Sequence, residues 1–107
     1  KGFIKAEVIS FDDLVELDDR ELQSLLREVS GERLGIALRG ADVKVREKIT
    51  RNMSQRAAEI LLEDMEARGP VRLSDVEAAQ KEILTIVRRM ADEGVIALNG
   101  GGSEELV

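Results

Sequence analysis

Charged residues recur at helical spacing in the segment "SQRAAEILLEDMEARGPVR", which covers residues 54–72. In an α-helix Arg56 and Glu63 would lie within about 20° of the same azimuth and about 10.5 Å apart along the axis. Glu59 falls between them, within one turn of each, and Asp64 flanks the row. Because small and aliphatic residues occupy the opposite side, the spacing predicts an exposed ridge with charges of both signs. We call Arg56, Glu59 and Glu63 the charged ridge.

A second row of charge precedes this segment. Lys44, Lys48 and Arg51 are spaced i, i+4, i+7, and Arg39 and Arg46 add to the positive charge of the same region. A row of this kind suits recognition of an acidic partner through charge complementarity. It is more often typical of an ordinary solvated helix face with mixed signs, and the pattern alone does not establish recognition of a partner.

The chain has few residues that could support catalysis or metal binding. The chain contains no histidine, cysteine, tyrosine or tryptophan, so disulfides, thiolate metal ligands and imidazole bases are excluded. No calcium-loop spacing is present, and the serines, which have no histidine to activate them, mostly stand where helices begin. The paired acids at 12–13 and 18–19 are explained by helix starts. We therefore predict no catalytic residue, no metal site and no enzymatic activity.

Composition favours a single helical domain. The 107 residues suffice for one core, and Phe3 and Phe11 are the only aromatic residues, so aliphatic side chains must fill it. Of the net charge of −6, residues 1–53 carry −1 and residues 54–107 carry −5. A dominant basic face with stacking aromatics, which nucleic-acid binding needs, is missing. Nucleic acid is therefore not an expected partner.

No membrane insertion is expected either. No apolar run approaches the roughly 20 residues that span a bilayer, and "KGFIKAEVIS" is too short and too polar for a signal peptide. A reducing, cytoplasmic setting fits the absence of cysteine.

Helix-start and helix-stop signals predict six helices. Five begin after Ser10, Asp18, Ser30, Ser54 and Ser74, and one spans about residues 42–52. Capping boxes are expected from Asp18 to Glu21 and from Ser74 to Glu77. Glycine stops are expected at Gly40, at Gly69 before Pro70, and at Gly94.

Apolar residues at helical spacing predict the core. The last helix is the longest, and we expect the other helices to pack on it. The inward-facing positions are Leu22, Leu25, Leu26, Val29, Leu34, Ala37, Leu38, Val45, Ile49, Ala57, Ala58, Leu61, Leu62, Met65, Val76, Ala79, Ile83, Val87 and Met90. Residues 95–98 are expected to be extended. The fold class is all-α, a six-helix armadillo-like irregular superhelix or bundle, without a fixed-period repeat that would make a true solenoid.

The exact amino-acid sequence of several stretches indicates a protein family more specifically than these patterns do. "NMSQRAA", "GPVRLSDVE" and "IVRRM", at their separations here, resemble the C-terminal domain family of the bacterial flagellar motor switch protein FliG, and the resemblance covers about residues 8–98. It implies a linker or hinge at 1–10, the six-helix domain at 11–98 and a flexible glycine-rich tail at 99–107. It also implies a flagellar rotor component that works through electrostatics and binds no cofactor.

The resemblance further implies partners and residue roles. In the family this domain meets the cytoplasmic loop of the stator protein MotA, at the cytoplasmic face of the inner membrane in the flagellar basal body. Neighbouring FliG subunits, FliM and FliF are contacted mainly through domains missing from this chain. The family's functional charges fall, with their signs kept, on Arg39 (usually Lys), Arg56, Glu63 (often Asp), Asp64 and Arg72.

A hinge precedes the six helices in the family and reorients the domain when rotation reverses. It typically has the sequence Met-Phe-any-Phe, whereas this chain has Val8, Ile9, Ser10 and Phe11, so only the last aromatic is kept. Two alternatives to a motor role remain open at this point. One is a generic helical protein-interaction scaffold, and the other is an adaptor for acidic targets that uses Lys44, Lys48 and Arg51.

Overall fold

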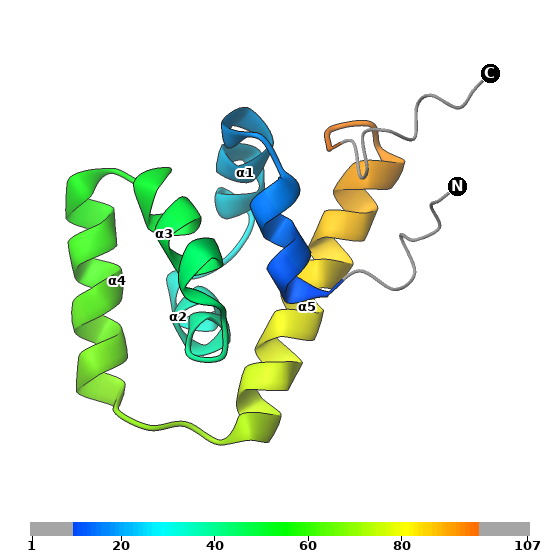
Figure 1. Ribbon diagram of the computed structural model, residues 1–107. Helices are drawn as coiled ribbons and strands as arrows, with labels where there is room; N and C mark the ends of the chain where they lie inside the picture. The colour runs from blue at the N-terminus through cyan, green and yellow to red at the C-terminus, as the bar shows by residue number, and fades with distance from the viewer. Residues whose placement is uncertain (1–9, 97–107) are drawn as a thin grey trace.

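The structure is a computed structural model in which residues 10–96 are described (Figure 1). Over that range all regular secondary structure is helical, which confirms the all-α, six-helix prediction. The elements are η1 (Phe11–Glu16), α1 (Asp19–Leu26), α2 (Gly31–Leu38), α3 (Val43–Arg51), α4 (Gln55–Arg68) and α5 (Leu73–Asp92). The first element, η1, is a 3-10 helix.

Side-chain caps fix most of the helix starts. At α1 the Asp18 carboxylate accepts a hydrogen bond from the Glu21 N–H at 2.8 Å, and the Glu21 carboxylate accepts from the Asp18 N–H at 3.1 Å. This is the predicted capping box, and it satisfies two amides that the helix itself leaves without acceptors. The caps at α2, α3 and α4 come from Ser30, Asp42 and Ser54.

The predicted cap of α5 is wrong. The helix begins at Leu73 with Arg72 as its N-cap, so Ser74 already lies inside the first turn and no Ser74–Glu77 box forms. The Arg72 carbonyl accepts hydrogen bonds from the amides of Asp75 and Val76, which starts the helical ladder two residues earlier than expected. Asp75 lies in the first turn, where its negative charge interacts favourably with the positive end of the helix dipole.

Gly40 has a different role from the one predicted. Among residues 10–96 only Gly69 and Gly94 have positive φ, at 71° and 83°, so Gly40 is not a left-handed helix stop. A Cβ at Gly40 would lie 2.7 Å from Cγ1 of Val76, closer than real side chains approach. Gly40 therefore lets the end of α2 lie directly against α5.

We expect Gly40→Ala to lower the free energy of unfolding by about 1–3 kcal/mol, because α5 must shift to accommodate the methyl group. Gly31→Ala is the matched control: a Cβ there meets no atom within 4 Å, so its effect should stay within about 0.5 kcal/mol. Urea unfolding of both variants measures the difference. Equal midpoints for the two variants would show that the α2–α5 approach is not tight.

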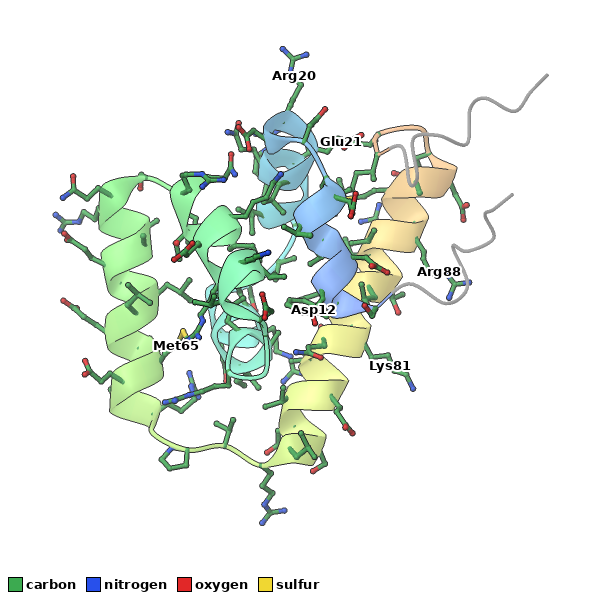
Figure 2. All side chains as sticks on the ribbon, in the orientation of Figure 1. Asp12, Arg20, Glu21, Met65, Lys81 and Arg88 are labelled. Carbon is green, nitrogen blue, oxygen red and sulfur yellow. The ribbon has the colours of Figure 1, made fainter. Side chains whose placement is uncertain are left out.

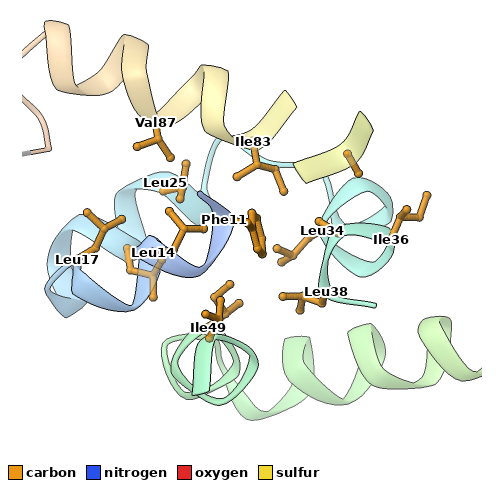
Figure 3. Close-up of a cluster of buried hydrophobic side chains, with 14 of the residues drawn as sticks. Phe11, Leu14, Leu17, Leu25, Leu34, Ile36, Leu38, Ile49, Ile83 and Val87 are labelled. Carbon is orange, nitrogen blue, oxygen red and sulfur yellow. The ribbon is translucent and has the colours of Figure 1, made fainter. Parts of the chain in front are cut away.

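The core is aliphatic apart from one ring (Figure 3). Phe11 lies among side chains that include Leu14, Leu34 and Ile83, and it is 5% exposed. All the predicted inward positions of α5 are buried, as are those of α2 and α3. The spacing of apolar residues thus predicted these faces correctly.

Residues 95 and 96 do not form the expected extended segment. The amides of Val95 and Ile96 donate to the Met90 carbonyl, so the chain folds back and Ile96 is buried against the core. The rest of that segment, residues 97–98, and the predicted tail at 99–107 lie outside the described residues.

The helices are arranged around α2, which packs against both α5 and α4. In Figure 1, α4 stands at the edge of the molecule, on the far side of α2 and α3 from α5. Because α4 packs mainly on the short α2, it buries only a narrow stripe, with Leu61 and Met65 inside. Leu62 was predicted to face inward, but it is 49% exposed, which corrects that assignment.

Candidate functional site

The charged ridge lies on the outer face of α4. Arg56, Glu59 and Glu63 are all exposed, and none forms an ion pair with any residue between 10 and 96. Figure 2 shows Met65 on the opposite side of this helix, pointing toward the body of the molecule. The ridge charges are therefore free to meet charges on another protein.

Apolar side chains border the ridge. Ile60, which is 56% exposed, follows Arg56 by one turn of α4, and Leu62 lies on the other side of the ridge. The outer face of α4 is thus a mixed surface on which charges alternate with aliphatic groups. Surfaces of this kind can bury apolar area while the charges set the orientation of the partner.

Asp64 differs from the ridge charges because it has partners within the chain. It is half-buried, and its Oδ2 lies 3.0 Å from Nη2 of Arg68. Nη1 of Arg68 also lies 3.9 Å from a carboxylate oxygen of Glu32 at the start of α2. These three residues link the end of α4 to α2. The i,i+4 spacing of Asp64 and Arg68 could have been noticed in the sequence, whereas nothing in the sequence places Glu32 beside them.

Arg39 also contacts α4. It is the C-cap residue of α2, and its Nη2 donates a hydrogen bond to the Met65 carbonyl at 2.6 Å. The same carbonyl accepts the Gly69 amide at 3.1 Å. A cation at this position meets the negative end of the α4 dipole.

Arg72 lies just beyond α4, in the connection to α5. It follows Pro70 and the half-buried Val71, its side chain is exposed, and it has no ion pair within the described range. The structure thus places all five predicted site charges on α4 or close to its C-terminal end. The exposed Arg39 and the half-buried Asp64 have partners within the chain, whereas the exposed Arg56, Glu63 and Arg72 form no ion pair among residues 10–96.

Only part of the predicted hinge is described. Val8 and Ile9 lie outside the described residues. Ser10 is exposed and is the N-cap of η1, where its amide donates to the Asp13 carboxylate at 2.9 Å. Phe11 is anchored in the core. The end of this segment is therefore fixed to the helical body.

The second basic row is not a uniform free surface. Lys44 and Arg51 are exposed, but Lys48 is half-buried and its Nζ donates to the Val15 carbonyl at 3.2 Å. This bond joins α3 to η1, so at least one member of the row has a structural role.

Two of the remaining ion pairs join the long helix to other parts of the chain, and one lies at its own C-terminal end. Arg33 on α2 pairs with Glu82 on α5 at 2.9 Å, and Arg89 on α5 pairs with Glu28 and Glu93. The hydrogen bond and the charge of Glu28 raise the pKa of Arg89. Periodicity could not have paired Arg33 with Glu82 or Arg89 with Glu28, because the partners lie far apart in the sequence.

Within residues 10–96, no three acidic side chains come together in a way that could hold a metal ion. In the same range, no helix combines the length and apolarity needed to cross a bilayer.

Comparison with known proteins identifies relatives of the whole chain. Residues 2–98 match the FliG C-terminal domain family. The flagellar motor switch protein FliG of Pseudomonas aeruginosa is 57% identical over 106 residues, which are 99% of this chain and 31% of that protein. The FliG of Vibrio cholerae is 58% identical over 90% of this chain and 28% of its own length. The chain thus spans about a third of the length of these curated relatives.

Solved structures agree with the sequence comparison. The crystal structure of residues 116–343 of FliG from H. pylori superposes with a TM-score of 0.84, at 35% identity, over 88% of this chain and 41% of that one. Full-length FliG from Aquifex aeolicus gives a TM-score of 0.80, at 44% identity, over 85% of this chain and 28% of that one. On sequence and fold together, the chain belongs to the FliG C-terminal domain family.

Proposed function

We propose that this chain is the part of a flagellar motor switch rotor that receives force from the stator, through contact between the charged ridge and the cytoplasmic loop of MotA. Its relatives are named flagellar motor switch proteins, which supports a place in the flagellar basal body, peripheral to the inner membrane. The observation that carries the proposal is the exposure of Arg56 and Glu63 without ion-pair partners among residues 10–96. No step of this function requires a catalytic residue or a cofactor.

The physics of exposed charges suits a moving contact. An exposed ion pair contributes about 0–1 kcal/mol and is screened over about 8 Å at physiological salt. Several such pairs can form and separate as the rotor passes the stator, whereas a single tight pocket would hold it. Charges of both signs also set the register, because a misaligned partner meets like charges.

The proposal assigns different roles to the site charges. Arg56 and Glu63 make the contact, and Arg72 extends it beyond the end of α4. Arg39 and Asp64 have partners within the chain and support the C-terminal half of α4. Changes of direction would act through the segment Val8–Phe11, and contacts with FliM, FliF and neighbouring FliG subunits mainly through parts of the longer relatives that this chain does not cover.

We expect the domain to bind a fragment of the stator's cytoplasmic loop with an affinity that falls as salt rises. Glu63→Lys should weaken this binding about tenfold, because an attractive pair becomes a repulsive one. The matched control is Glu77→Lys, a reversal at an exposed α5 position without an ion pair in the described range, which should change the affinity less than twofold. Isothermal titration at two salt concentrations provides the measurement.

The same titration separates the alternatives. A generic scaffold would show no binding of the wild-type domain. An acidic-target adaptor would lose binding when Lys44, Lys48 and Arg51 are neutralised together, and it would be indifferent to Glu63→Lys. Either outcome would contradict the proposed stator contact.

A further inference from the structure

Arg39 holds the end of α4 from a neighbouring helix. Its guanidinium donates to the Met65 carbonyl at 2.6 Å, and Met65 is 7% exposed. The carbonyls in the last turn of an α-helix lie at the negative end of the helix dipole, so a cationic donor from outside stabilises them. The Met65 carbonyl has two lone pairs, and the Gly69 amide uses the other one.

The helix that carries Arg39 is itself fixed to the body. Gln80 on α5 donates a hydrogen bond to the Ala37 carbonyl at 2.9 Å. Gly40, which has no side chain, lies so close to Val76 of α5 that a Cβ would not fit between them. The C-terminal end of α2 is thus bound to α5 on one side and, through Arg39, to α4 on the other. The connection from α5 to the end of α4 therefore runs through α2 and the Arg39 side chain.

The placement of α4 depends on few contacts. Its main packing partner is α2, where Met65 and Leu61 approach Gly35. The ion pair of Arg68 with Glu32, at 3.9 Å and exposed, adds little. Glu63 lies only two residues before Met65, so movement of this end of α4 shifts Glu63 relative to the rest of the molecule.

We infer that Arg39 is a positioning residue for the charged ridge: it sets where the C-terminal half of α4 stands and does not itself touch the stator. The inference deepens the proposed stator contact and rests on it for the binding consequence. Its physical basis, the bond from Arg39 to Met65, is a property of the domain alone. The two can therefore be tested separately.

Hydrogen exchange tests the positioning directly. We expect Arg39→Gln to speed exchange of the amides at residues 66–69 about fivefold, because a shorter, neutral amide replaces the charged donor at the last turn of α4. Arg39→Lys keeps a charged donor and should stay within about twofold of the wild type. Arg88→Gln removes an exposed α5 cation that makes no ion pair among residues 10–96, and should leave these amides unchanged. Wild-type exchange rates in Arg39→Gln would overturn the inference.

Binding to the stator-loop fragment gives a second, independent readout. A residue that contacts the stator contributes to the salt dependence of binding, so Arg56→Gln should flatten the plot of log Kd against log salt. Arg39→Gln should weaken binding about threefold and keep the wild-type slope. A flattened slope for Arg39→Gln would mean direct contact and overturn the inference. If the wild-type domain fails to bind, only the proposed function is overturned, and the exchange experiment still decides the role of Arg39.

Discussion

We expect the replacement of Phe11 with alanine to lower the free energy of unfolding by about 3–5 kcal/mol, the range for removing a buried aromatic ring. Phe11 is one of only two aromatic residues in the chain, it is 5% exposed, and it lies close to Leu34 and Ile83 in the core (Figure 3). The aliphatic side chains around it cannot fill the space that the ring leaves. A loss of this size is a large fraction of the stability of a small domain.

Thermal unfolding followed by circular dichroism checks this result, and the melting temperature should fall by at least about 10 °C. Val15→Ala is the control, because Val15 lies in the same 3-10 helix but is 36% exposed, and it should cost less than about 1 kcal/mol. A melting temperature for Phe11→Ala equal to that of the control would show that the start of the helical body is not anchored by this ring.

We expect that exchanging the two ridge charges, by Arg56→Glu together with Glu63→Arg, will weaken binding to the stator-loop fragment at least about 30-fold and stop swimming. The net charge stays at −6, yet each partner charge now meets a charge of its own sign. Because both side chains are exposed, the fold is retained. Stability should even rise slightly, since the exchange puts the acid near the N-terminal end of α4 and the base nearer its C-terminal end.

The exchanged variant is tested in three ways: titration measures its binding, swarming on soft agar measures motility, and circular dichroism measures folding. The control exchanges charges on exposed positions of α5, by Glu77→Arg together with Arg88→Glu, and should leave binding and swarming close to the wild type. Loss of folding in the ridge variant would show that Arg56 and Glu63 stabilise the domain. Full swarming would show that they do not contact the stator.

Local signals predicted the helices well. Caps act within three residues, so the capping box at Asp18 and the cap at Ser54 could be recognised without knowledge of the fold. The apolar spacing of α5 was also sufficient to predict its buried face, because α2, α1 and η1 pack against this helix. The cap at Ser74 was wrong because the extended residues after Pro70 allow the helix to begin at Leu73.

Features that depend on the neighbouring helix could not be predicted. Leu62 is aliphatic, but α4 packs mainly on the short α2, so the stripe that it buries is narrower than the apolar pattern. The bond from Arg39 to the Met65 carbonyl joins residues 26 apart in the sequence and involves a backbone atom, which has no sequence signature. The resemblance supplied Arg39 as a functional charge, and its contact with α4 comes from the structure alone.

The central claim is that Arg56 and Glu63 meet charges of the opposite sign on the stator, and charge complementation tests it most directly. The affinity of the exchanged variant is measured against the wild-type stator-loop fragment and against a fragment in which the positive and negative charges are exchanged. We predict that the exchanged fragment restores binding to within about threefold of the wild-type pair. If the exchanged variant binds both fragments equally weakly, these two side chains do not make the contact, and the account is contradicted.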